Sequence, residues 1–238
     1  MPNIPKKIQL VMACAVFFAV LQLAMPEFIF LRDVMTSEPW RWWTAQWVHV
    51  GWRHYLLNMV ALGCLPFIFP QSSRLELLWA IVVLSPLVSL GLYIFFPHVN
   101  AYAGLSGVLH GLYAWAALMV LCARYTLPIA ALSKTPSNSL NSSYQQITNQ
   151  AGSSALPRFL SEKAFAWFVL LGVIIKVCIE KKVGHTDTER LIGAPVLIQA
   201  HQIGLVAGII YFSLLCGWYK FSRLSSRTDW CTNRKNIN

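Results

Sequence analysis

The sequence predicts an all-α polytopic membrane protein with six spanning helices. Of its 238 residues, 56% are hydrophobic and only 12% are charged. The mean hydropathy of +0.53 lies outside the usual range of soluble globular domains. Apolar runs joined by short polar segments take up nearly the whole chain, so we expect one membrane domain over residues 1–238.

Six apolar runs could form helices across the hydrocarbon layer, which is roughly 30 Å thick and needs about 20 residues per crossing. We expect these helices at 8–25, 52–69, 75–96, 104–123, 164–179 and 196–219. The second and fifth runs are short, and the second carries His54 and Asn58. The first follows Lys6 and Lys7 as a signal peptide would, but it has no small-x-small cleavage site. We therefore expect it to remain as the first helix.

The formal charge of +10 is a topology signal rather than the mark of a nucleic-acid-binding surface. The Lys and Arg residues lie mainly between hydrophobic runs, whereas a nucleic-acid-binding protein has them clustered on one accessible face. With a cytoplasmic N-terminus, twelve of the 19 cations fall in inner segments and six in outer loops, and Lys176 lies within the fifth span. This bias predicts that both termini are cytoplasmic.

The segments outside the spans are short and polar. Residues of about 126–162, with a Ser-, Asn- and Gln-rich stretch at 133–158, are expected to form a flexible cytoplasmic linker. Residues of about 220–238 are expected to form a basic cytoplasmic tail. The six cysteines are scattered without CxxC pairs, so they predict neither a disulfide framework nor a zinc cluster.

Four polar side chains fall within the predicted spans: His54, Asn58, Ser106 and His201. Polar groups at membrane depth are costly, which makes each of them a functional candidate. In the predicted topology all four lie near the outer ends of helices two, four and six. They can therefore meet at one depth.

Ser106 has the features of a nucleophile. It lies at the start of the fourth span between Gly104 and Gly107, where glycine lets substrate come close to the hydroxyl. The unpaired N–H groups of a helix start also point toward an oxyanion formed there. A serine needs a base to take its proton, and His201 is the histidine at matching depth on another late helix.

Small residues recur at four-residue spacing on the two helices that carry Ser106 and its base. Gly107 and Gly111 lie on the fourth span, and Ala200, Gly204 and Gly208 lie on the sixth. Small residues let helices in lipid approach closely. This pattern predicts a tight contact that brings the serine and the histidine within hydrogen-bond reach.

Two further polar residues can complete the chemistry. His54 and Asn58 are four residues apart, so both can donate toward an oxyanion from one helix face. No acidic residue is tied by spacing to the histidine, because the candidates all lie at span edges: Glu27, Glu76, Glu162 and Glu180. The sequence therefore predicts a Ser–His dyad without a carboxylate.

Taken in order, these motifs resemble the rhomboid family of intramembrane serine proteases. They are Trp40-Arg41, the run from His49 to Asn58, Gly-Leu-Ser-Gly at 104–107 and Ala-His-x-x-Gly-x-x-x-Gly at 200–208. The resemblance implies a six-transmembrane-helix rhomboid fold, with Ser106 as nucleophile and His201 as general base. It also implies an oxyanion hole made by His54, Asn58 and the backbone N–H of the serine.

One position departs from the common bacterial pattern. Many bacterial rhomboids carry an aromatic residue, often Tyr, four residues after the serine, where it packs on the catalytic histidine. Here that residue is His110, and the run from Ser106 to Gly111 resembles the rhombosortase branch. That branch implies substrates with a Gly-Gly-containing C-terminal anchor in a Gram-negative inner membrane, cleaved on the periplasmic side. Supporting the catalytic histidine and simple packing remain alternatives for His110.

Other interpretations remain beside this one. A general rhomboid protease of other transmembrane substrates, a non-catalytic client-binding relative and a small transporter are the rival functions; the last would more often show repeated halves. His49 is expected to anchor a loop rather than bind the oxyanion. No cofactor is expected, and no metal, because neither an HExxH motif nor a carboxylate accompanies the histidines. The expected partners are single-pass membrane-anchored proteins and the lipid bilayer.

Overall fold

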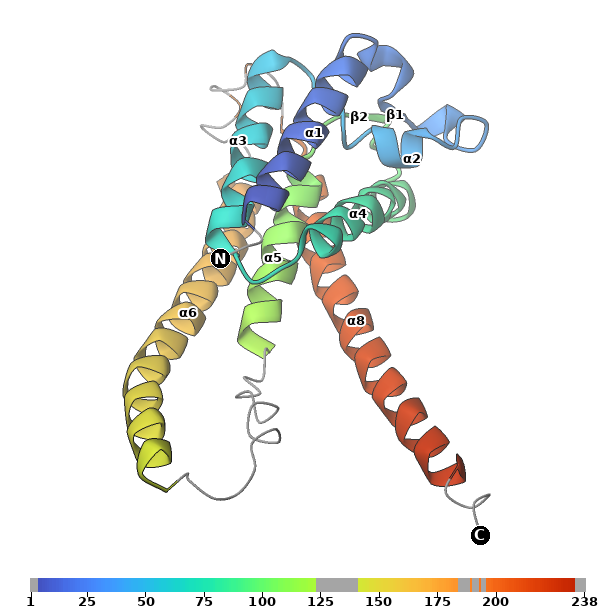
Figure 1. Ribbon diagram of the computed structural model, residues 1–238. Helices are drawn as coiled ribbons and strands as arrows, with labels where there is room; N and C mark the ends of the chain where they lie inside the picture. The colour runs from blue at the N-terminus through green and yellow to red at the C-terminus, as the bar shows by residue number, and fades with distance from the viewer. Residues whose placement is uncertain (1–3, 123–140, 184–188, 190–192, 194–195, 234–238) are drawn as a thin grey trace.

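The structure, a computed structural model, describes residues 4–122, 141–183, 189, 193 and 196–233, and of 141–160 and 219–233 only the helical backbone. The described chain is almost entirely helical, as predicted (Figure 1). In order, its elements are α1 (Ile4–Gln22), η1 (Met25–Glu27), β1 (Phe30–Leu31), η2 (Arg32–Val34), α2 (Arg41–Thr44), α3 (Trp52–Ile68), α4 (Arg74–Phe95), β2 (Ala101–Tyr102), α5 (Ser106–Cys122), α6 (Asn141–Val183) and α8 (Ile198–Asn233).

Six of these helices, α1, α3, α4, α5, α6 and α8, overlap the six predicted spans. By length and hydropathy, three described helices are clearly able to cross a membrane: Ile4–Gln22, Arg74–Phe95 and Ile198–Trp218. The helices α3 and α5 have 17 residues each. The short second span is thus a real helix, whose polar residues and length keep it below a plain hydropathy threshold.

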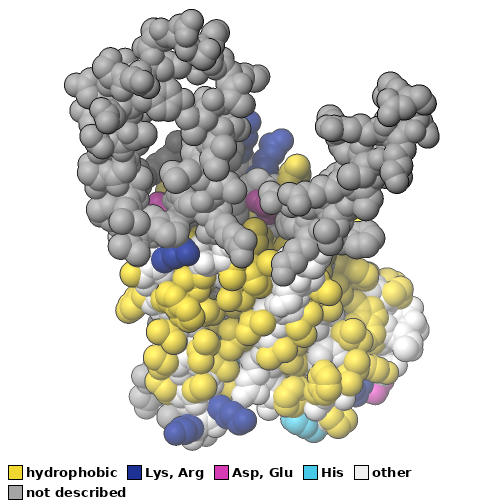
Figure 2. Space-filling view, turned by 90° about the horizontal axis from the view of Figure 1, so that it is seen from below, with side chains coloured by type: hydrophobic (Ala, Val, Ile, Leu, Met, Phe, Trp, Pro, Cys, Tyr) yellow, Lys and Arg dark blue, Asp and Glu magenta, His cyan; other side chains and the backbone are white. Residues whose placement is uncertain are grey.

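The surface of the bundle is apolar where a lipid-facing surface is expected. Large hydrophobic side chains such as Val16, Phe168 and Leu214 are more than 60% exposed. Figure 2 shows hydrophobic side chains over much of the described surface, with Lys and Arg toward its edges. Exposing such an apolar surface to water would cost free energy, whereas contact with hydrocarbon does not. The arrangement is that of an all-α membrane protein.

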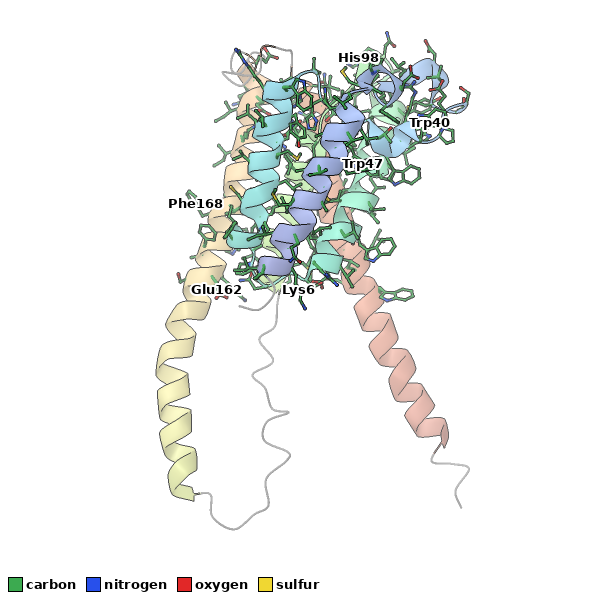
Figure 3. All side chains as sticks on the ribbon, turned by 45° about the horizontal axis from the view of Figure 1, so that its top comes forward. Lys6, Trp40, Trp47, His98, Glu162 and Phe168 are labelled. Carbon is green, nitrogen blue, oxygen red and sulfur yellow. The ribbon has the colours of Figure 1, made fainter. Side chains whose placement is uncertain are left out.

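The two ends of the bundle differ. Lys6 and Glu162 lie near one end, and Trp40 and His98 lie at the other (Figure 3). The start of α1 and the end of α8 both point away from the end that carries Trp40 (Figure 1). Both described chain ends therefore lie on the same side of the bundle.

Helix α5 runs through the middle of the bundle, and its contact with α8 is the most extensive between any two elements described. Leu112 and Trp115 of α5 are fully buried. A β-carbon on Gly111 would lie 2.7 Å from the backbone oxygen of Gly204, and one on Gly107 would lie 2.8 Å from that of Ala200. The two backbones are in direct contact, which confirms the predicted small-residue packing.

A folded segment covers the end of the bundle where α5 begins. Strands β1 and β2 pair antiparallel, with Phe30 opposite Tyr102. Arg32, which follows β1, donates from its guanidinium to four backbone oxygens at and beyond the end of α4, those of Leu92, Tyr93, Phe96 and Val99. The last carbonyls of a helix lack partners, so this arginine satisfies them and fixes the chain that leads into Ser106.

The expected linker and tail are more helical than predicted. Residues 141–162, the second half of the expected linker, belong to α6, and 220–233 of the expected tail continue α8. Once an apolar span has formed a helix, each added residue gains a hydrogen bond without a new nucleation cost, so the helix extends into polar sequence. Residues 126–140 and 234–238 lie outside the described residues.

Candidate active site

Ser106 is the first residue of α5, and the backbone before it is tightly constrained. Gly104 has a φ of 142°, which residues with a side chain rarely adopt. A β-carbon there would also lie 2.6 Å from the Cε1 atom of His54. The Tyr102 hydroxyl donates to the Gly104 carbonyl at 2.5 Å. This local geometry places the half-buried serine beside the His54 ring.

His201 lies opposite Ser106 on α8. Its Nε2 atom is 2.9 Å from the serine Oγ, which is hydrogen-bond distance. The histidine is 2% exposed. Because the glycines of α5 and α8 let the two backbones touch, a serine and a histidine 95 positions apart become direct partners.

Glu180, which the sequence places at the edge of a predicted span, contacts His201 on α8. Its Oε2 atom is 2.7 Å from the Nδ1 atom of His201. The carboxylate is almost fully buried, and its other oxygen, Oε1, is paired with Lys176 one turn earlier on α6. The expectation of a dyad without a carboxylate is therefore wrong as a description of the geometry. Lys176, which lies within the predicted fifth span, pairs with Glu180.

A signal for Glu180 was present in the sequence. Lys176 and Glu180 are four residues apart near the outer end of an apolar helix, a spacing at which opposite charges pair. Ionisable groups at membrane depth are functional candidates by default, and this pair meets that criterion. What spacing could not show is the rotation of α6, which decides whether the carboxylate faces His201 or lipid.

His54 and Asn58 of α3 face the same cavity as Ser106. Both side chains are largely buried, and the His54 Nδ1 and Asn58 Nδ2 atoms have no hydrogen-bond partner among the described atoms. A buried donor without a partner is costly. The two residues line the cavity, and these two enclosed atoms have unused hydrogen-bonding capacity beside it.

His49 has the anchoring position that was expected for it. The imidazole is fully buried, and its Nε2 atom accepts from the backbone N–H of Leu105 at 3.4 Å. The backbone of His49 exchanges two 2.7 Å hydrogen bonds with the Gln22 amide. Burial, with a smaller effect from nearby His54, lowers the pKa of His49 to about 3, so this loop residue is neutral at physiological pH.

His110 lies one turn below the serine on α5. Its ring is stacked on that of His201, with 4.2 Å between centroids and 18° between planes. Its Nδ1 atom is 2.7 Å from the carbonyl oxygen of Ser106 and donates to it, which fixes the ring. Stacking on His201 was one of the two expectations for this residue.

Ser106 opens onto two cavities. The larger, of about 510 Å³, is walled by α3, α5 and α6 and is mostly apolar, with Tyr113 and Lys176 in its lining. The smaller, of about 190 Å³, lies beside the segment that leads into α5 and is lined by Ala101 and Leu197 among others. Ser106 and His54 line both cavities, so a bound chain could cross the hydroxyl from one to the other.

Comparison with known families accords with this geometry. The family model for the Rhomboid domain matches residues 36–218, which include every side chain of the site. The chain belongs to the rhomboid family. Rhomboids are intramembrane serine proteases, and the predicted family and fold are confirmed. A search of curated proteins found no match.

One group of potential metal ligands occurs among the described residues of this rhomboid. His110, Glu180 and His201 have ligating atoms within 4.8 Å of one another, and all three are buried. The expectation of no metal rested partly on the absence of a carboxylate near the histidines, and Glu180 removes that reason. Hydrogen bonds join Glu180 to His201 and to Lys176, and His110 to the Ser106 carbonyl.

Proposed function

We propose that this rhomboid is an active intramembrane serine endopeptidase, with Ser106 as nucleophile and His201 as general base. The observation that supports this most strongly is the 2.9 Å contact between Ser106 Oγ and His201 Nε2. A serine becomes a nucleophile when an adjacent base can take its proton. Here the serine lies at the start of a helix, and both residues line the cavity of about 510 Å³.

The reaction proceeds through an acyl-enzyme. Ser106 Oγ forms a bond to the substrate carbonyl carbon as its proton passes to Nε2 of His201. The C–N bond then breaks, and the departing nitrogen takes the proton from the imidazolium. Water attacks the ester in the same way, losing its proton to His201 and releasing the new carboxylate. No cofactor takes part in these steps.

His54 and Asn58 hold the oxyanion in this proposal. Both residues line the cavity beside Ser106 and carry nitrogen atoms without a partner among the described atoms. The backbone N–H of Ser106 lies at a helix start, where such groups have no partner within the helix. Donors placed where charge develops stabilise the transition state more than the ground state. An imidazole N–H at His54 and the amide N–H of Asn58 are donors of this kind.

The substrates we propose are membrane-anchored proteins whose C-terminal anchor contains Gly-Gly, as in the rhombosortase branch. His110 at the position that is often Tyr in bacterial rhomboids supports that branch. The cavity of about 190 Å³ beside Ser106 suits small residues next to the cleaved bond, and the larger apolar cavity suits a hydrophobic anchor. Cleavage of other transmembrane substrates is the alternative that the experiment below separates.

We further propose that the protein spans a bacterial inner membrane with its termini in the cytoplasm and Ser106 facing the periplasm. The distribution of Lys and Arg supports this orientation. The start of α1 and the end of α8 lie away from the end that carries Trp40 and His98 (Figures 1 and 3). Accessibility of single introduced cysteines to an impermeant thiol reagent, measured in intact cells of a strain without other exposed thiols, tests the orientation.

The deciding experiment replaces Ser106 with Ala, and separately His201 with Ala, and follows cleavage of a co-expressed reporter with a Gly-Gly-containing anchor. We expect cleavage by the unaltered chain and none by either variant. Cleavage that persists in both variants would overturn the protease assignment and favour a client-binding protein. A parallel reporter with a transmembrane anchor lacking Gly-Gly tests the branch, because equal cleavage of both reporters would contradict the proposed specificity.

A further inference from the structure

We propose that Glu180 orients and electrostatically supports His201, so that the site works as a Ser106–His201–Glu180 triad. This inference rests on the proposed protease function. The carboxylate lies 2.7 Å from His201 Nδ1, on the far side of the imidazole from Ser106. Because Glu180 contacts His201 rather than the reacting atoms, it is a positioning residue.

The contact selects the tautomer of His201. An ionised carboxylate can only accept, so Nδ1 must carry the proton that it donates to Oε2 of Glu180. Nε2 then presents its lone pair to the Ser106 hydroxyl, 2.9 Å away. Without the carboxylate, the tautomer with its proton on Nε2 would compete, and in that form His201 cannot accept the serine proton.

The carboxylate itself is held in place from both sides. Glu180 is 3% exposed, so its charge needs partners. His201 contacts Oε2 and Lys176 contacts Oε1, so each carboxylate oxygen has its own partner. The Lys176 side chain is about half exposed, so its ammonium group balances the buried charge from the rim of the cavity.

The charged and titratable groups that face His201 come from three helices. His110 is stacked on it from α5, Glu180 faces it from α6 with Lys176 behind, and His54 faces it from α3 across the cavity. Glu180 is the single negative charge among these described neighbours. It is therefore the group that stabilises the imidazolium formed when Ser106 gives up its proton.

The remaining helix packed on α8 is α4, and there the contact is apolar. Ile203 of α8 fits against Gly91 of α4, one turn or less from the histidine. No described ionisable side chain of α4 reaches His201. The Glu180 contact is thus the polar support of the imidazole on its Nδ1 side.

The test uses the full-length protein in detergent or liposomes and compares Glu180→Gln with the unaltered chain. Glutamine keeps the size and an acceptor but removes the charge. We expect kcat to fall roughly 100- to 10,000-fold with little change in KM, as when a triad carboxylate is replaced. We also expect the acidic limb of the kcat profile to move to lower pH, because the imidazolium loses its stabilising anion. The Glu180→Asp variant keeps the negative charge on a shorter side chain, so it should retain more of the rate than Glu180→Gln.

The same change at Glu162 is the matched control. Glu162 lies on the same helix but near the opposite end of the bundle (Figure 3). Glu162→Gln should leave kcat and the pH profile unaltered. The rate at which a fluorophosphonate labels Ser106 gives a second readout that needs no substrate, and the thermal midpoint reports whether Glu180→Gln folds.

The outcomes separate this inference from the protease assignment. If the Ser106→Ala and His201→Ala variants are inactive but Glu180→Gln loses less than tenfold in kcat, or changes only KM, the triad is overturned and the protease stands. If Ser106→Ala still cleaves and the unaltered chain is not labelled, the protease assignment fails first. A loss of tenfold or more in both kcat and labelling, in a folded variant, supports the triad.

Discussion

The His110 ring lies face to face with that of His201, one helical turn below the serine. In the proposed mechanism, this stacking holds the His201 ring while it transfers a proton. Aromatic pairs contribute about 0.5 to 1.5 kcal/mol beyond buried area. We expect His110→Ala to lower kcat roughly 2- to 12-fold, the rate equivalent of that energy. His110→Tyr keeps a stacked ring and should stay closer to the unaltered rate.

The two His110 variants also separate stacking from the hydrogen bond to the Ser106 carbonyl. Neither alanine nor tyrosine can reproduce that bond in the same place. If both variants lose the same activity, the bond rather than the ring is what matters. Fluorophosphonate labelling and the cleavage assay should rank the variants in the same order.

Asn58 is the clearest test of the oxyanion hole. Its Nδ2 atom is buried without a partner in the described residues, so its removal costs the resting protein no hydrogen bond there. We expect Asn58→Ala to lower kcat on the order of 100- to 1,000-fold with a small change in KM, because the donor acts on the transition state. Steady-state kinetics on the anchored reporter measures both constants.

Leu56, on the same helix and more than half exposed, provides the control for this experiment. Leu56→Ala should change neither kcat nor KM. The thermal midpoint of Asn58→Ala should equal or exceed that of the unaltered chain. A large drop in the midpoint together with the loss of activity would instead assign Asn58 a structural role.

The contact between α5 and α8 should tolerate no added carbon. A side chain on Gly204 would run into the backbone oxygen of Gly107. Overpacking of this kind costs about 1 to 3 kcal/mol, so we expect Gly204→Ala to lower the thermal midpoint and to weaken the Ser106–His201 contact. Thermal unfolding in detergent and fluorophosphonate labelling measure the two effects.

Gly63 is the matched glycine, because it lies inside α3 with nothing within 4 Å of an added β-carbon. Alanine favours a helix over glycine by about 1 kcal/mol, so Gly63→Ala should leave the midpoint unchanged or raise it. Equal destabilisation at the two sites would mean that close packing of α5 on α8 is not the cause.

The lowered pKa of buried His49 leads us to expect that the stability of the protein depends on pH. Its pKa is about 3 when folded and about 6.5 when unfolded, so the unfolded chain binds more protons between these values. The contribution of neutral His49 is therefore complete above about pH 6.5 and is lost as the pH falls toward 3. His49→Gln, which can still accept from Leu105 N–H, should flatten the fall of the thermal midpoint between pH 6.5 and 4. An unchanged slope would contradict this role.

The sequence by itself determined the membrane class and the approximate spans, and it predicted most residues of the candidate site. The apolar runs are long enough to be read directly, and Ser106, His201, His54 and Asn58 stand out because polar groups in such runs are rare. The glycines at four-residue spacing also predicted which helices touch, because a helix face follows from periodicity alone. The extension of α6 and α8 into polar sequence was missed, since composition does not show how far a helix propagates.

Only the tertiary structure decided that Glu180 faces His201. Spacing fixes which residues share a face of one helix, but it does not fix the rotation of that helix against its neighbours. Glu180 and His201 lie on α6 and α8, 21 positions apart, and their contact depends on how both helices pack on α5. A carboxylate near the end of a span can face lipid headgroups or a buried base. The packing of the bundle turns the Glu180 carboxylate toward His201.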